Sequence, residues 1–282
     1  DHTMAKIKEF CGLRPMKELV HLIAELPYDV VSSDEARKIA SRRPYSFFHI
    51  TKPEIDLPAS ISPYDDSVYA KGKENLEAFI NQGFFSRDRK PSLYLYSQIM
   101  DSRMQTGLVA GVSIDDYINN IVKKHELTRE EKEIDRMKHI DVLGAQTGLV
   151  FLMFLQDDEK KTIFQNAMQA PPEYDFVSDD GIRHILRIIQ DDDLIVNVKK
   201  SFANSMLYIA DGHHRYGTAL NYLNALTSAS CELPPDHPAR FVLIGLCAME
   251  DPGALILPTH RVLSGFGAAS PAQVVDALRK GV

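Results

Sequence analysis

Apolar residues recur at helical spacing in several stretches of the chain, and short apolar runs of β-rich composition separate these stretches. The spacing predicts helices over residues 16–26, within 27–40, over 67–83, from about 129 onward, over 213–228 and from 271 onward. Ser32 or Ser33 is a suitable N-cap for the second helix, and Gly83 closes the third. Helices are therefore expected in both halves of the chain.

Runs rich in β-branched and aromatic residues predict the strands. Strands are expected over residues 45–51, 181–191 and 206–210, with hairpins over 91–114 and 240–263, the second around a turn at 250–253. Helices and strands alternate irregularly, so we expect an α+β fold in which helices flank a mixed sheet with hairpins. One such domain is expected over residues 4–282, incomplete at its C-terminal end, with residues 1–3 left from a tag.

Charge and cysteine content narrow the classes of function. The formal net charge of −7 argues against nucleic acid as the main partner, because nucleic-acid binding needs a basic surface. Cys11, Cys231 and Cys247 have no C-x-x-C spacing, which suits a reducing cytoplasm and gives neither a disulfide framework nor a zinc site. The sequence shows no signal peptide and no apolar run of membrane-spanning length. We therefore expect a cytoplasmic protein with no membrane partner, and the oligomeric state stays open.

The densest group of ionisable residues is the segment Asp211-Gly212-His213-His214-Arg215. It lies where a short apolar strand ends and a helix begins, and the first turn of a helix attracts anions through unpaired N–H groups and the helix dipole. Gly212 allows the backbone to approach a ligand closely, and Arg215 can make two hydrogen bonds to one phosphate or carboxylate. His213 and His214 lie about 100° apart on a helix, so one is expected to contact the ligand and the other to support it.

A structural role explains the same residues without a ligand. Asp211 is a suitable N-cap, histidines occur at helix ends, and Arg215 can pair with any surface carboxylate. Spacing alone leaves both interpretations open. The functional interpretation gains support because an aspartate, a glycine, two histidines and an arginine follow directly after a buried strand.

This segment resembles the signature turn of the ParB/sulfiredoxin superfamily, in which a Gly-x-x-Arg turn at a helix start holds nucleotide phosphates. The resemblance is closest to the free-serine kinases of that superfamily, which use Asp-Gly-His-His-Arg. It implies that Asp211, His213 and His214 lie at a phosphoryl-transfer site, that Gly212 and Arg215 contact phosphate, and that the core is ParB/sulfiredoxin-like with large insertions. A sulfiredoxin-like activity is not expected, because His213 stands where that activity needs a cysteine.

The rest of the chain is similar to an uncharacterised bacterial family of unknown function. The similarity is carried by the blocks GLRP, PYDVVS, KHELTREEKEIDR, YIADGHHRY and LPTHRV, which extend from residue 12 to about residue 262. This second resemblance covers most of the chain. It implies that the chain is related to this family, whose activity is not established.

Residues 123–136 form a second polar segment. Thr128 and Glu131 make a T-x-x-E capping box, which predicts a helix that starts near residue 129. The residues expected to face the core are Ile134, Met137 and Ile140, and those expected on one polar stripe are Arg129, Lys132, Arg136 and His139. Ion pairs on an exposed helix face explain Glu130, Glu131 and Asp135. The residues expected to bind an anionic ligand are His125, Lys132 and Arg136, with Glu126 as the general base for a substrate hydroxyl.

Two shorter blocks add candidate ligand-binding residues. Asp29, beside Tyr28, follows a proline that rigidifies the turn, and a turn role for Asp29 is the favoured explanation of this block. Both residues stay candidates for a ligand pocket because the block carries part of the family resemblance. His260 and Arg261 follow a predicted strand, where they either complete an anion site or form a surface edge.

The chain lacks a P-loop, a G-x-G-x-x-G fingerprint and a G-x-S-x-G elbow. The resemblance to the free-serine kinases instead implies a nucleotide-using phosphotransferase for a small phosphorylated or hydroxylated molecule, with free serine or phosphoserine as substrate and ADP or ATP as the nucleotide. Mg²⁺ is expected as cofactor, with Asp211 as its ligand. A phosphatase acting on a phosphometabolite and a non-catalytic regulator that binds a nucleotide or phosphometabolite remain alternatives.

Overall fold

A computed structural model describes residues 5–126, 130–229, 232–256, 265, 267 and 269–280, and for residues 130–132 and 229 it describes the backbone only. The strands are β1 (Ile7–Lys8), β2 (Leu13–Pro15), β3 (Phe85–Arg87), β4 (Leu93–Met100), β5 (Arg103–Ser113), β6 (Val122–Lys123), β7 (Val150–Phe154), β8 (Tyr174–Val177), β9 (Arg183–Ile189), β10 (Leu207–Asp211) and β11 (Phe241–Ala248). The α-helices are α1 (Val20–Ile23), α2 (Ser33–Ala40), α3 (Phe48–Thr51), α4 (Asp66–Asn81), α5 (Ile114–Ile118), α6 (Glu130–Leu143), α7 (Asp158–Ala167), α8 (Asp192–Phe202), α9 (His213–Ala229) and α10 (Pro271–Lys280), and the 3₁₀ helices are η1 (Tyr28–Val30), η2 (Pro53–Asp56) and η3 (Pro238–Arg240).

A mixed nine-stranded sheet forms the centre of the fold. Its strand order is β6-β10-β7-β11-β5-β4-β9-β8, and β1 pairs with β5 beside this path. The pairs β6–β10 and β7–β11 are parallel, while β7–β10, β5–β11, β4–β5, β4–β9 and β8–β9 are antiparallel. The predicted α+β class with a mixed sheet, a hairpin and flanking helices is confirmed.

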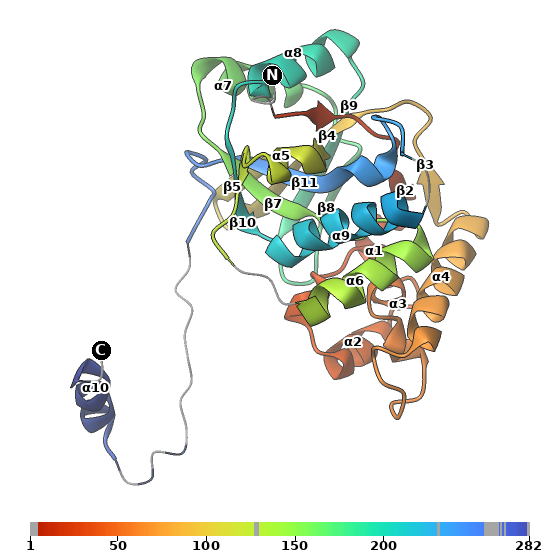
Figure 1. The fold of residues 1–282 in the computed structure, drawn as a ribbon, viewed down its shortest axis with the longest axis vertical. Helices are drawn as coiled ribbons and strands as arrows, with labels where there is room; N and C mark the ends of the chain where they lie inside the picture. Colours follow the sequence, from red (N-terminus) through yellow and green to blue (C-terminus); the bar gives the residue numbers. More distant parts are fainter. Residues whose placement is uncertain are drawn as a thin grey trace.

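Helices cover both faces of this sheet (Figure 1). Helices α7 and α8 pack on one face, where Phe164 and Phe202 belong to the main core cluster. On the other face Tyr216 and Leu223 of α9 belong to the same cluster. Helix α6 contacts α9, and α4 contacts α6, so the N-terminal helices form a further layer beyond α9 (Figure 1).

The long helices have the ends that the sequence predicts. Ser32 caps α2 and forms a capping box with Glu35, and Gly83 follows α4 at a φ of 75°, which favours glycine. The hairpin predicted over residues 91–114 is the β4–β5 pair, and the strand predicted within 181–191 is β9. Helix α9 buries Tyr216 and Leu223, as the helical spacing predicts.

Three predicted elements differ from the structure. Residues 45–51 contain helix α3 rather than a strand, because a helix of four residues is too short to show a helical period in the sequence. The helix predicted over 16–26 is only the four-residue α1. The hairpin predicted over 240–263 is wrong in its pairing, since β11 pairs with β5 and β7, and residues 254–256 are not in a strand. Residues 257–264 lie outside the described chain.

Helix α6 is rotated relative to its predicted orientation. His139, expected on the polar face, is only 2% exposed, whereas Ile134, expected in the core, is 45% exposed. The side chain of Glu133 is also buried, against α9. The reason is that α6 packs between α9 and the N-terminal helices, where its buried polar side chains have partners. Glu133 accepts a hydrogen bond from Asn221 of α9, and His139 donates one to the Ile50 carbonyl of α3.

Within the part of the chain that the structure describes, no helix is both long and apolar enough to span a membrane.

Candidate functional site

The site is built where β10 passes into α9. The register of β10 against β7 shifts between Ile209 and Asp211, and such a bulge redirects the side chains that follow it. Gly212 then takes a φ of 91°, and a Cβ atom on it would lie 3.3 Å from the Cα atom of Val150. Both observations favour glycine at this position. The Tyr216 N–H donates to the Gly212 carbonyl, so Gly212 rather than Asp211 precedes the first helical turn.

Arg215 extends from the first turn of α9 toward the chain that leads into β7. One end of its guanidinium donates to the Leu149 carbonyl (2.6 Å), and the other donates to a carboxylate oxygen of Asp29 (2.8 Å). Asp29 comes from η1 in the N-terminal layer and is 45% exposed. The DGHHR turn and the PYDVVS block, 186 residues apart, therefore meet at this ion pair.

A second arginine joins the first through an aromatic ring. The guanidinium carbons of Arg136 and Arg215 lie 4.3 and 5.5 Å from the centre of the Tyr28 ring, so both cations contact one tyrosine. Arg136 also pairs with its neighbour Asp135, which in turn accepts a hydrogen bond from the Tyr69 hydroxyl. Two positive charges are thus held close together by one aromatic ring and two carboxylates.

Three side-chain nitrogens, two of them on these arginines and one in the first turn of α9, are buried without a hydrogen-bond partner in the described part of the chain. They are Arg136 Nη1, His214 Nε2 and Arg215 Nε. Arg136 and Arg215 also line a small cavity of about 30 Å³, which holds about one water molecule or one ligand oxygen. A buried N–H group without a partner is costly, so these nitrogens indicate a position for a ligand oxygen or an ordered water.

His213 points to the other side of α9, toward the segment that follows β6. It is 3% exposed, its Nε2 accepts the backbone N–H of His125 (3.4 Å), and its Nδ1 lies 3.6 Å from a carboxylate oxygen of Glu126. Burial lowers the pKa of His213, and the neighbouring His125 lowers it further. The neutral ring therefore carries its proton on Nδ1, directed at Glu126.

His125, Glu126 and His213 form a group of three potential metal ligands within the described residues, with their ligand atoms within 4.8 Å of one another. A metal on His213 Nδ1 would displace the proton there and break the hydrogen bond at Nε2. Two imidazoles also suit transition metals better than Mg²⁺, which prefers oxygen ligands. The exposed carboxylate of Asp211 at the end of β10 fits Mg²⁺ better, because this ion is often bound by one carboxylate together with phosphate oxygens.

The predicted site residues form two groups at one helix start. Asp29, Arg136 and Arg215 meet on one side of α9, while His125, Glu126 and His213 meet on the other. The two groups lie on different sides because Arg215 follows His213 by about 200° around the helix axis. The side chain of Lys132, together with His260 and Arg261, lies outside the described part of the chain.

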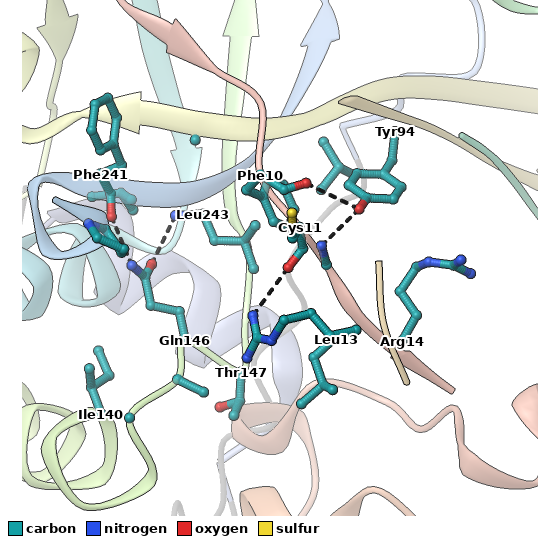
Figure 2. Close-up of a pocket in the computed structure, with 18 of the residues that line it drawn as sticks. Phe10, Cys11, Leu13, Arg14, Tyr94, Ile140, Gln146, Thr147, Phe241 and Leu243 are labelled. Atoms are coloured by element: carbon teal, nitrogen blue, oxygen red, sulfur yellow. Dashed lines mark hydrogen bonds between the residues drawn. The ribbon is translucent and has the colours of Figure 1, made fainter. Parts of the chain in front are cut away.

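The sequence reasoning missed the segment that lies opposite Arg215. Gln146, Thr147, Gly148 and Val150 line the small cavity, and Leu149 accepts the hydrogen bond from Arg215. The only sequence signal there was a polar glycine-containing stretch, AQTG, between a helix and an apolar run. The side chains of Gln146 and Thr147 also line a much larger cavity of about 970 Å³ (Figure 2).

This larger cavity lies beside the sheet on the face that α9 occupies. Its walls come from β4, β5 and β11, from the segment around β2, and from α6 and α9. Figure 2 shows Phe10, Leu13, Tyr94, Ile140 and Leu243 around the opening. None of the predicted ionisable site residues that the structure describes lines it, so no pattern in the sequence indicated this cavity.

Fold and site together define a mixed α/β protein with a glycine turn between strand and helix, surrounded by arginine, histidine and carboxylate side chains. Residues 7–282 match the model of the family described as "Protein of unknown function (DUF1015)", and the chain belongs to this family. The predicted membership in an uncharacterised family is thereby confirmed. No curated protein and no solved structure matches the chain.

Proposed function

We propose that this protein is a phosphotransferase that holds a phosphate group at the start of α9 and acts on a small hydroxylated molecule. The supporting observation is that three buried nitrogens, on Arg136, His214 and Arg215, have no hydrogen-bond partner among the residues that the structure describes. Two of them belong to guanidinium groups, which bind phosphate oxygens through strong charge-assisted hydrogen bonds. The N–H groups of the first turn of α9 add further donors for the same anion.

The two sides of the helix start suit two roles in phosphoryl transfer. Arg136 and Arg215 would neutralise the transferred phosphate, as catalysis of this reaction relies mainly on positioning and charge stabilisation. Glu126 is exposed beside His213 and would accept the proton of the substrate hydroxyl. The hydroxyl oxygen then attacks the terminal phosphorus of the nucleotide, a new P–O bond forms, and the bond to the bridging oxygen breaks. Mg²⁺ bound by Asp211 and phosphate oxygens would supply additional charge neutralisation.

The resemblance of the DGHHR turn to the ParB/sulfiredoxin superfamily supports the same proposal. Its free-serine kinases make serine or phosphoserine the first substrates to test, with ADP or ATP as the nucleotide. The core of this chain would then correspond to a ParB/sulfiredoxin-like unit, and the N-terminal helices that supply Asp29 and Tyr28 would be insertions.

Phosphorus NMR of the protein with phosphoserine and Mg²⁺, with and without ADP, tests the proposal. We expect phosphate to move onto ADP, and we expect this transfer to be lost in Asp211→Asn and to persist in Asp193→Asn. Asp193 is a suitable control because it is an exposed aspartate at the start of α8, outside the site. Release of free phosphate without ADP would favour a phosphatase instead. Saturable binding of phosphoserine or ADP without turnover would favour a regulator, and either result would overturn the phosphotransferase.

A further inference from the structure

The large cavity offers space that a serine-sized substrate would leave empty. At about 970 Å³ it is at the upper end of the range of small-molecule sites, which bury most of a drug-sized ligand. The space exists because β5 presents small side chains there: Val109 and Gly111 both line the cavity. The other face of the sheet is filled by α7 and α8.

Two polar side chains in the cavity wall, those of Gln146 and Arg14, already have partners within the protein. The side-chain amide of Gln146 donates to the Phe241 carbonyl and accepts the Leu243 N–H, both at 2.8 Å (Figure 2). Arg14 forms a two-point ion pair with Asp88 at 2.7 and 2.8 Å. Because these groups have their partners, the wall offers mostly apolar contact surface to a ligand.

The apolar cavity borders the small cavity that the two arginines line. Ile140, Gln146, Thr147 and Val242 line both cavities and form the boundary between them. On one side of this boundary lie apolar walls, and on the other lie buried guanidinium nitrogens that have no partner among the described residues. A ligand that extends across the boundary would therefore meet apolar surface at one end and positive charge at the other.

We propose that the two cavities together bind an amphipathic organic anion, with its apolar body in the large cavity and its phosphate or carboxylate at Arg136 and Arg215. This proposal rests on the phosphate site proposed above and names the class of its substrate: a hydroxylated or phosphorylated molecule with a hydrocarbon or aryl body. The positive charge of the two arginines favours an anionic group, and the mostly apolar wall of the large cavity favours an apolar body.

Calorimetric titration with a short ligand series tests this inference. The ligands are inorganic phosphate, butyl phosphate, octyl phosphate, acetate, octanoate and octanol. We expect octyl phosphate to bind at least tenfold more tightly than butyl phosphate, because each buried methylene strengthens binding about three- to fourfold. A similar gain for octanoate over acetate would assign the head group to carboxylates as well, whereas a gain confined to the phosphates would assign it to phosphate alone.

Filling the cavity provides the decisive variant. Val109→Phe places a larger side chain in the large cavity, and we expect it to abolish the chain-length effect while leaving the affinity for inorganic phosphate unchanged. Val177→Phe is the matched control, because Val177 is 60% exposed on β8 and does not line the cavity. Ala24→Phe, also in the cavity wall, serves as a second variant if Val109→Phe does not fold.

The outcomes separate this inference from the phosphate site. Equal affinities for inorganic, butyl and octyl phosphate would overturn the amphipathic ligand and leave the phosphate site standing. If octanol binds as tightly as octyl phosphate, the protein does not recognise the head group, and this result also overturns the inference. An absence of binding by every ligand in the series would remove both proposals.

Discussion

His139 provides a quantitative test of the packing beside the candidate site. Its ring is 2% exposed, Nε2 donates to the Ile50 carbonyl (3.1 Å), and burial, with Arg136 close by, lowers its pKa from 6.5 to about 4. The folded protein therefore favours the neutral ring, and the unfolded chain takes up the proton first as the pH falls. Stability from this residue is fully present above pH 6.5 and is lost as the pH falls toward 4.

The magnitude follows from the two pKa values. At pH 5, protonation of His139 shifts the folding equilibrium toward the unfolded chain by a factor of about 30, which lowers the free energy of unfolding by about 2 kcal/mol. His139→Gln keeps a donor for the Ile50 carbonyl and cannot titrate. Urea unfolding of both proteins at pH 8 and pH 5 gives the test, and we expect the wild type to lose about 2 kcal/mol more than the variant.

Comparing two pH values in each protein removes any constant effect of the substitution on packing. Other titrating groups are common to both proteins and cancel in the difference, provided that they do not couple to residue 139. Equal losses in the wild type and in His139→Gln would refute the reasoning, because they would mean that His139 titrates alike in the folded and unfolded states.

Three further predictions test packing, charge and the site. Gly217→Ala should lower the free energy of unfolding in urea by about 1–3 kcal/mol, because its Cβ would lie 2.2 Å from a carboxylate oxygen of buried Glu133. Adding Glu133→Ala in the same chain should restore part of this stability, and additive effects of the two substitutions would contradict the clash. Burial raises the pKa of Asp116 to about 6, so stability from this residue is present below pH 3.8 and is lost as the pH rises through 6. Asp116→Asn should therefore gain about 2 kcal/mol on the wild type between pH 4 and pH 8, and parallel pH profiles would contradict this. Asp29→Asn should strengthen inorganic phosphate binding about two- to fivefold in calorimetry, because it removes an exposed carboxylate that competes for Arg215, and weaker binding would instead mean that Asp29 positions the arginine.

The sequence predicts those parts of the fold that are determined by local signals. The N-cap at Ser32, the glycine after α4 and the β4–β5 hairpin depend on neighbouring residues, and each was found. The pairing of β11 with β7 and β5 depends on strands far away in the chain, so the turn signal at residues 250–253 gave the wrong partner. The orientation of α6 was missed for a related reason, since a helix between two helical layers buries polar residues that have specific partners there.

The candidate site shows the same division. The DGHHR turn could be located because a strand, a glycine and a helix start follow one another in sequence, and the glycine has the positive φ that such a turn favours. Its partners Asp29 and Arg136 were candidates only through family resemblance or local charge, and no spacing linked them to Arg215. The large cavity could not be predicted at all, because an absence of packing leaves no periodic signal in the sequence.

The structure also indicates why the turn alone would not make a complete site. Arg215 pairs with a carboxylate from η1 and shares the ring of Tyr28 with Arg136 from α6, so the charge around it depends on the N-terminal layer as well as on β10 and α9. His213 depends instead on the segment after β6, through the backbone of His125. Each side of the helix start is therefore fixed by a different part of the chain. A substitution in the N-terminal layer should alter anion binding at Arg215 and leave the Glu126–His213 pair intact, which separates charge neutralisation from proton transfer in any activity the site performs.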